Sequence, residues 1–482
     1  MTASQKDELL SLLLKEAGIG CLSTPAIAAS GAEAALSFSQ QRVWFLSRLE
    51  PQSSAYNVPI RIDISGSLDA ARLEAALNAV LQRHHVLQSH FPERNGQPVQ
   101  QRISGLRLPL PVQDLTALLE PERQARLDEL TRDEAQAPFD LDCGPVIRWT
   151  LIKSAAETFR LLVTIHHIAC DDWSMRVFVQ DVMNEYRSAP LPPLNVQYSD
   201  VAAWQAREIS GPRYAELLEY WRPRVQGIEA ESGLLPDRAR TRVRNSRAGY
   251  AALALSPELM QRVSSFSRGA GCTPYMTLLA ALKSLSAACS GRSEAVVGTP
   301  VAGRHRDDVR GLVGFFVNTL VLRTAIERET PFTDILMRVR DTALDAFAHD
   351  EMPFELLVKE MGLERDLSST PFFQIFFNML PAEQLPSTEG LPFRIEEIDY
   401  CDTGASKFDL TLYVRERNRQ TWVQAVYNAG IFEAGTIERL LTNYSEFLDA
   451  AVRNPEKSIG TLLSMLGSAS DAVNQFNTPC EK

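Results

Sequence analysis

The sequence has few of the features that mark metal sites, disulfide frameworks and secreted proteins. Its 482 residues include seven cysteines and seven histidines, with no CxxC pair and no HxxxH or HxH pattern. An odd number of irregularly spaced cysteines favours reduced thiols in a cytoplasm over a disulfide framework or a zinc site. We therefore expect a cytoplasmic protein with no bound metal.

Long apolar runs and clusters of basic residues are also missing. No apolar run reaches the ~18 residues that a membrane helix requires. The leucine-rich amino terminus has charges of both signs around it and no small-residue cleavage site, so it does not resemble a secretion signal. The net charge of -11, without clustered Lys and Arg, argues against nucleic acid as a partner. Small molecules or proteins are the expected partners, and no membrane association is expected.

The length and the hydrophobic pattern predict two α/β halves. A chain of 482 residues exceeds what one hydrophobic core usually organises. Periodicity predicts helices over 5–17, 70–87, 173–188, 273–290, 332–350 and 436–453, and strands over 146–153, 159–168, 294–304, 316–326, 407–417 and 421–429. A small-residue linker follows the first helix, the folded body begins near Leu36, and the boundary between the halves falls near 205–220.

The stretch TIHHIACDDWS, residues 164–174, contains the most informative cluster of polar residues. His166 and His167 end a predicted strand, and because successive strand residues point to opposite faces, at most one can face a given cavity. Histidine has an unperturbed pKa of ~6.5, which suits a general base, whereas adjacent histidines diverge and make a metal site less favourable. The competing interpretation is a structural histidine followed by Asp171 or Asp172 as a helix cap.

The charge of Asp171 leads to a separate prediction. A carboxylate at the end of an apolar strand is costly unless it is paired. We therefore expect an arginine partner for Asp171 from elsewhere in the chain.

Seven motifs occur in an order that is similar to one known family. HHIACDDWS resembles the HHxxxDG active-site motif of condensation domains of nonribosomal peptide synthetases, LSFSQQRVWFL (36–46) their opening motif and RHHVLQSHF (83–91) their second. YSDVAAWQ, GLVGFFVNTLVLR, HDEMPFELLV and RDLSSTPFFQIFF resemble the later motifs. The resemblance covers about residues 36–465.

The resemblance implies an α/β fold of two chloramphenicol-acetyltransferase-like lobes. These lobes form a V-shaped pseudo-dimer with the active site in a tunnel between them. The expected division is an N-terminal helix and linker over 1–35, an N-terminal lobe over 36–205, a C-terminal lobe over 206–465, and a linker towards an adenylation domain over 466–482. A monomer is expected.

The resemblance also assigns roles to the central motif. His167 becomes the catalytic residue that orients or deprotonates the attacking amine, and His166 becomes structural. Asp171 becomes structural too, paired with Arg83 of RHHVL. Asp172 stands where the family has glycine, and its charge either favours a protonated His167 imidazole or points away as a helix cap.

Four further residues are candidates for the wall of the tunnel. Trp173 and Ser174 open the helix after the motif and shape its turn. Asn318 lies in the motif GLVGFFVNTL, where a core strand with turn glycines is the competing interpretation. Arg148 lies on the neighbouring strand and is a candidate contact for a donor acyl or pantetheine group, with a structural ion pair as the preferred alternative.

The implied reaction joins an acyl thioester donor to the amine of an aminoacyl group on a peptidyl carrier protein. No permanently bound cofactor is expected, only the phosphopantetheine arms of carrier proteins and acyl-CoA as a candidate substrate. Because a short helix and linker precede the body, a fatty acyl-CoA starter type that initiates lipopeptides is preferred. The alternatives are an internal type that takes a peptidyl donor from another subunit docked on residues 1–20, a free-standing acyltransferase, and a non-catalytic scaffold that binds carrier proteins. The intact histidine pair favours a catalyst.

Overall fold

The computed structural model describes residues 27, 33–229, 233–241, 246–363, 369–380, 385–417 and 419–466. The helix predicted over 5–17, most of its linker and all but the first residue of the tail over 466–482 lie outside the described residues.

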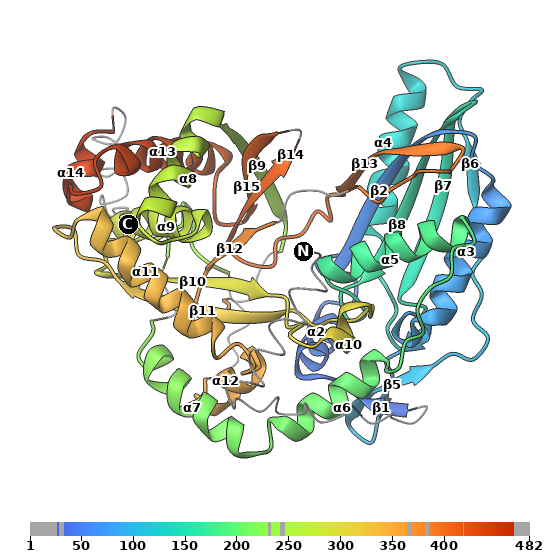
Figure 1. The fold of residues 1–482 in the computed structure, drawn as a ribbon, viewed down its shortest axis with the longest axis horizontal. Helices are drawn as coiled ribbons and strands as arrows, with labels where there is room; N and C mark the ends of the chain where they lie inside the picture. The colour runs from blue at the N-terminus through green and yellow to red at the C-terminus, as the bar shows by residue number, and fades with distance from the viewer. Residues whose placement is uncertain are drawn as a thin grey trace, which may run out of the picture.

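The described chain forms two lobes arranged as a V, each built on its own β-sheet (Figure 1). In the N-terminal lobe the strand order is β13-β2-β8-β7-β6. Its elements are β2 (Asn57–Gly66), α3 (Ala70–Arg83), β6 (Val112–Asp114), α4 (Glu122–Gln136), β7 (Ile147–Ala155), β8 (Thr158–His166), α5 (Asp172–Tyr186) and β13 (Phe393–Tyr400). Strand β8 is buried along nearly its whole length, as expected of a central strand covered on both faces.

The C-terminal lobe contains a six-stranded sheet in the order β11-β10-β12-β14-β15-β9. Its strands are β9 (Ala248–Leu255), β10 (Glu294–Val301), β11 (Asn318–Ala325), β12 (Ile375–Met379), β14 (Leu410–Arg417) and β15 (Gln420–Asn428). Its helices are α8 (Pro257–Gly269), α9 (Pro274–Ser290), α11 (Phe332–Phe347), α13 (Ala434–Arg453) and α14 (Ile459–Ser464). Helix α9 is buried over most of its length, which explains its lack of a polar face.

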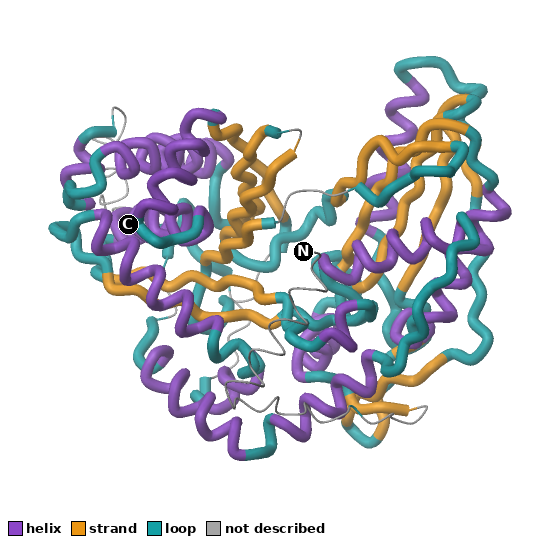
Figure 2. The backbone as a smooth tube through the Cα atoms, in the orientation of Figure 1, coloured by secondary structure: helices purple, strands orange, loops and turns teal. Residues whose placement is uncertain are grey.

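Short elements join the two lobes. Helices α6 (Tyr198–Glu208) and α7 (Pro212–Val225) run along the lower edge of the V, where the boundary near 205–220 was predicted (Figure 2). A separate small sheet contains β1 (Glu33–Ala35), β3 (Ser89–His90), β4 (Glu93–Arg94) and β5 (Gln97–Arg102). The remaining short helices are α2 (Phe38–Leu49), η1 (His85–Gln88), α10 (Asp307–Arg310) and α12 (Phe354–Glu360). Arg42 of α2 lies 3.6 Å from Glu355 of α12, so the two halves also meet through an ion pair.

The strand β13 departs from the predicted division of the lobes. It belongs to the range 206–465 in the sequence, yet it pairs antiparallel with β2 in the N-terminal sheet. Arg415 and Arg417 of β14, in the C-terminal sheet, contact the carboxylate of Asp399 in β13 at 2.9 and 3.1 Å. The chain therefore returns to the N-terminal sheet at β13 and crosses back to the C-terminal sheet through residues 401–409.

Most predicted elements are confirmed with small changes in their ends. The helix predicted over 70–87 ends at Arg83, because His84 adopts an extended backbone conformation, and η1 follows it. The strand predicted over 159–168 ends at His166, so His167 already belongs to the turn.

A buried lysine in the C-terminal lobe makes its stability depend on pH. Lys283 of α9 is fully buried and donates to the Leu322 carbonyl and the Thr324 hydroxyl, each at 2.7 Å. Burial lowers its pKa to about 7 from an ordinary 10.5. Between these values the unfolded chain binds a proton that the folded chain does not, so folding becomes more favourable as pH rises from about 7.

Replacing this lysine by methionine is expected to remove that pH dependence. Lys283→Met keeps the length of the side chain and removes the buried amine, so we expect the free energy of unfolding near neutral pH to rise by about 1–3 kcal/mol. Urea unfolding at several pH values measures both effects. The exposed Lys359→Met is the matched control, and an unchanged slope with pH in Lys283→Met would contradict the assignment.

Candidate active site

His166 is the last residue of β8 and is buried in the N-terminal lobe. Its ring lies against Tyr56 and Phe139, with centroids 6.4 and 5.8 Å away, and Nδ1 accepts from the Ile168 N–H at 3.2 Å. Nε2 is 3.5 Å from the hydroxyl of Ser47. Burial lowers its pKa to about 3, so His166 is neutral and held entirely by protein contacts.

His167 occupies the first position of the turn and faces different neighbours from His166. Its N–H donates to the Tyr56 carbonyl at 2.7 Å, and its ring contacts Phe315 with centroids 4.6 Å apart. Nδ1 is buried and makes no hydrogen bond of good geometry with the described residues. Burial first, and then the Lys407 charge, hold its pKa well below 6.5, so the imidazole is neutral near pH 7.

Asp171 caps helix α5 and has the arginine partner that its charge requires. One carboxylate oxygen accepts from the Ser174 N–H and hydroxyl at 2.8 and 2.7 Å, and from Arg304 at 3.1 Å. The other accepts from the Phe316 N–H at 3.0 Å. Both side chains of the ion pair are almost completely buried.

The prediction that Arg83 pairs with Asp171 is wrong. Arg83 ends α3 and donates to Asp181 of α5 at 3.0 Å. Asp181 lies ten residues after Asp171, which is about 15 Å along a helix. Because α3 packs beside the middle of α5, its last residue cannot reach the amino end of α5.

Arg304 was missed in the sequence, although it connects the central motif to the second half of the chain. It follows β10, and its guanidinium also donates to the Val309 and Leu312 carbonyls at 2.8 Å and lies 3.9 Å from the Phe316 ring centroid. No periodicity links residues 133 positions apart; the available signal was a lone arginine after a strand, in GTPVAGR.

The loop GLVGFF, residues 311–316, is held against the histidine turn by close packing and hydrogen bonds. A Cβ atom at Gly314 would lie 2.1 Å from the Tyr198 ring, so only glycine allows this packing. The Gly314 N–H donates to the Ser174 hydroxyl at 3.0 Å, and the Tyr198 hydroxyl donates to the Phe315 carbonyl at 2.6 Å. These contacts hold the ring of Phe315 against His167. Phe315 is the second site residue that was not predicted from the sequence.

A third missed residue is His84, which joins the second motif to the same loop. It is buried, its Nε2 is 3.1 Å from Asp181, and its Nδ1 accepts from the Val313 N–H at 3.3 Å. Burial lowers its pKa, so it bridges α5 and GLVGFF as a neutral ring.

Asp172 points away from His167. Its carboxylate accepts from the Tyr400 hydroxyl at 2.6 Å and pairs with Arg176 one turn along α5. Asp171 is the cap, and Asp172 is the first residue of the helix. The expected shift of His167 towards its protonated form does not occur, because burial and cations lower that pKa.

Trp173 and Asn318 make contacts with the protein backbone. The Trp173 indole is 40% exposed and donates to the Arg310 carbonyl at 2.9 Å, which ties α5 to α10. The Asn318 amide donates to the Asp350 and Met352 carbonyls at 2.7 and 2.6 Å. Asn318 is the first residue of β11, and these contacts tie that strand to the turn over 350–352.

Arg148 forms the structural ion pair that was preferred for it. Its Nε donates to Glu134 at 2.7 Å, and its guanidinium lies 4.0 Å from the Phe139 ring centroid. It therefore supports the aromatic ring that packs against His166.

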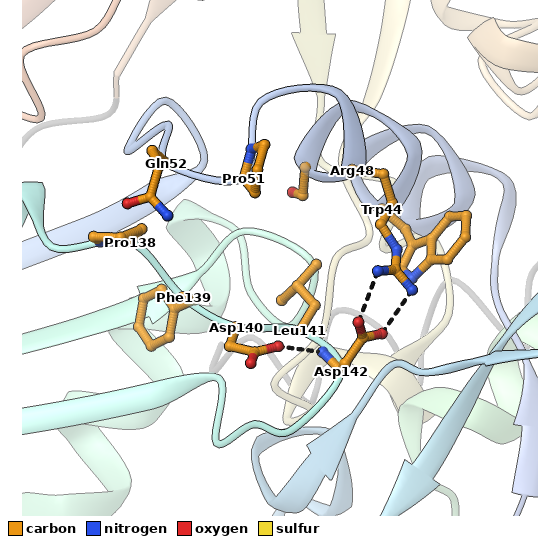
Figure 3. Close-up of a pocket in the computed structure, with 10 residues that line it drawn as sticks. Trp44, Arg48, Pro51, Gln52, Pro138, Phe139, Asp140, Leu141 and Asp142 are labelled. Carbon is orange, nitrogen blue, oxygen red and sulfur yellow. Dashed lines mark hydrogen bonds and ion pairs between the residues drawn. The ribbon is translucent and has the colours of Figure 1, made fainter.

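A cavity of about 380 Å³ lies beyond Phe139 and Ser47, the two residues that also contact His166 (Figure 3). It is lined by Trp44, Ser47, Arg48, Pro51, Gln52, Pro138, Phe139, Asp140, Leu141 and Asp142. Arg48 and Asp142 form two hydrogen bonds of 2.7 and 2.8 Å at its edge. His167 is not part of its lining, so this cavity belongs to the His166 side of the motif.

Within the described ranges, no group of three or more His, Cys, Asp and Glu residues is arranged to hold a metal ion. None of the helices in this part of the chain combines the length and apolar character needed to cross a membrane.

The fold of two sheets in a V and a histidine turn held by both halves define an acyltransferase class. The family model named "Condensation domain" matches residues 31–472, and the chain belongs to this family. Condensation domains catalyse amide bond formation in nonribosomal peptide synthetases.

The relatives are multidomain peptide synthetases. One of the linear gramicidin synthase proteins of Brevibacillus parabrevis is 39% identical over 434 residues, which are 89% of this chain and 8% of that protein. Phosphinothricin tripeptide synthetase PhsC of Streptomyces viridochromogenes is 37% identical over 92% of this chain and 41% of its own length. The chain thus spans less than half of either relative.

Solved structures share the fold over nearly their whole length. The X-domain in its complex with OxyB from teicoplanin biosynthesis has a TM-score of 0.81 and 26% identity, covering 92% of this chain and 99% of that one. SgcC5 from Streptomyces globisporus has a TM-score of 0.73 and 26% identity, covering 88% and 100%.

Proposed function

We propose that this domain joins a carrier-bound acyl or peptidyl thioester to the amine of an aminoacyl group on a second carrier protein. The observation that carries the proposal is His167: its backbone N–H is held by the Tyr56 carbonyl of one half, and its neutral ring packs against Phe315 of the other. A tunnel between the lobes, as the resemblance implies, would bring the two phosphopantetheine arms to this ring from opposite sides.

The chemistry of His167 favours positioning over strong base catalysis. An α-amine has a pKa of about 8, so an imidazole of much lower pKa removes little proton from the ammonium form. It can accept a hydrogen bond from the neutral amine and orient the nitrogen lone pair towards the donor carbonyl. The C–N bond then forms, the proton on nitrogen passes to the imidazole, and the C–S bond breaks with the proton returned to the thiolate. Since Nδ1 is buried, Nε2 is the atom that would meet the amine.

The relatives favour a carrier-bound donor over the fatty acyl-CoA that was preferred from the sequence. The gramicidin and phosphinothricin synthetases, whose matching modules are of the internal type, are 39% and 37% identical to this chain. The first condensation domain of the calcium-dependent antibiotic synthetase shares only the fold, at 20% identity. We therefore propose the internal type, with a donor carrier, an acceptor carrier and an adenylation domain as partners in a larger synthetase.

A non-catalytic scaffold is the second candidate. It is supported by the X-domain, which shares this fold and is in a complex with the protein OxyB. Against it stands the complete histidine and aspartate network of this chain, in which His167 is the only ring of the pair that is not fully buried.

One assay separates these candidates. The protein is incubated with an aminoacyl carrier protein and a panel of peptidyl-carrier, acyl-carrier and acyl-CoA donors, and the acceptor is followed by intact mass. We expect a mass increase with carrier-bound donors. Acylation from acyl-CoA alone would support the starter type, acylation of free amines alone a free-standing acyltransferase, and binding of carriers without any product the scaffold.

A further inference from the structure

The segment between β13 and β14 holds Lys407 at the place where the chain crosses from one sheet to the other. On the N-terminal side, the Ser54 hydroxyl donates to the Thr403 carbonyl at 2.6 Å. On the other side, the Ser406 N–H donates to the Ser246 carbonyl at 2.6 Å. The position of Lys407 is therefore set by both halves.

The side chain of Lys407 reaches the histidine pair through Tyr56. Its ammonium lies 5.4 Å from the Tyr56 ring centroid, a cation–π distance. The same tyrosine contacts the His166 ring at 6.4 Å and accepts the His167 N–H at 2.7 Å. The ammonium, the phenol ring and the His166 imidazole thus form one cluster, to which His167 is joined through its backbone N–H, and the Lys407 charge lowers the pKa of both histidines.

Burial and charge define the ionisation of the cluster. Burial lowers the pKa of Lys407 to about 8, and the Arg42 charge adds to this effect. Lys407 is therefore an ammonium below about pH 8. The charged and titratable groups that face the cluster come from α2, β7, the histidine turn and the start of α5: Arg42, Arg148, Cys170, Asp171 and Asp172.

We propose that Lys407 is a positioning residue for amide formation: its ammonium, which the crossing segment brings to the Tyr56 ring, acts through His167 together with burial, so that this imidazole stays neutral and able to accept a hydrogen bond from the amine. This inference rests on the proposed function. A positive charge beside an imidazole disfavours the imidazolium form, and partial burial strengthens the effect because solvent screens it less.

The direct test is the titration of His167 by NMR on protein labelled at the histidine rings. The seven histidines are few enough to resolve, and a His167→Gln sample assigns the signal. In Lys407→Met we expect the titration midpoint of His167 to rise by on the order of one pH unit. Lys407→Arg keeps the charge and should keep the midpoint low, as should the exposed control Lys359→Met. An unchanged midpoint in Lys407→Met would overturn the proposal.

Kinetics supply the second readout. With wild-type activity established, Lys407→Met should lower kcat more at about pH 6.5 than at about pH 8, with KM for the acceptor unchanged and with recovery in Lys407→Arg. An equal loss at every pH would show a merely structural role. If Lys407→Met does not fold, Lys407→Gln carries the same comparison. A wild-type protein that forms no amide would refute the proposed function, whereas the titration would still decide whether Lys407 controls His167.

Discussion

His167→Gln is expected to lower the rate of amide formation by about 100-fold or more, because positioned groups that accept a proton in the transition state contribute about 10²–10⁴-fold. Glutamine retains a polar side chain but cannot take up the proton that leaves the amine nitrogen. The measurement is the initial rate of product formation by intact mass, with kcat and KM determined separately for the acceptor.

The fold should survive this substitution. The His167 ring contacts Phe315, and its Nδ1 makes no hydrogen bond of good geometry with the described residues, so losing the ring leaves no buried partner unpaired. His166→Gln is the matched comparison: its ring is buried and Nδ1 accepts from Ile168, so we expect a loss of stability alongside any loss of rate. Retention of most activity in His167→Gln would refute its role in the reaction.

Arg304→Met is expected to destabilise the protein by about 3–5 kcal/mol, because removing one partner of a buried ion pair leaves the other charge uncompensated. Here Asp171 would remain buried, held only by Ser174 and the Phe316 N–H. The Val309 and Leu312 carbonyls would also lose the hydrogen bonds that the guanidinium donates. We expect loss of activity as well, since this loop positions Phe315 against His167.

Arg83→Met is the matched control for this prediction. Arg83 pairs with Asp181 in a partly exposed position, and Asp181 keeps its contact with His84. We expect a cost of about 1–2 kcal/mol, measured like the first by urea unfolding. The double variant Asp171→Asn with Arg304→Met should be less destabilised than the sum of its parts. An equal cost for Arg83→Met and Arg304→Met would contradict the observed pairing.

Local patterns were enough to predict most of the elements. The apolar alternation of residues 158–166 and the helical period of residues 172–186 depend on neighbours in sequence, and both elements lie where they were expected. The cap at Asp171 follows from the same local chemistry. The divergence of His166 and His167 was expected from strand alternation and is observed, although His167 is already the first residue of the turn.

Asp171 pairs with an arginine, as was predicted, but that arginine is Arg304 and not Arg83. A buried carboxylate requires a cation, and this follows from desolvation alone. Which arginine supplies it depends on where β10 ends relative to α5, and those elements lie in different halves of the chain.

The sequence by itself determined the two-lobed α/β fold, the family and the histidine turn, because motif order and hydrophobic period are properties of neighbouring residues. Only the tertiary structure decided that Arg304 neutralises Asp171, that Phe315 and Lys407 approach His167, and that the Asp172 carboxylate points to Tyr400. Each of these contacts joins residues more than 130 positions apart, and only the packing of the lobes and the passage of the chain through β13 and back to β14 bring them together.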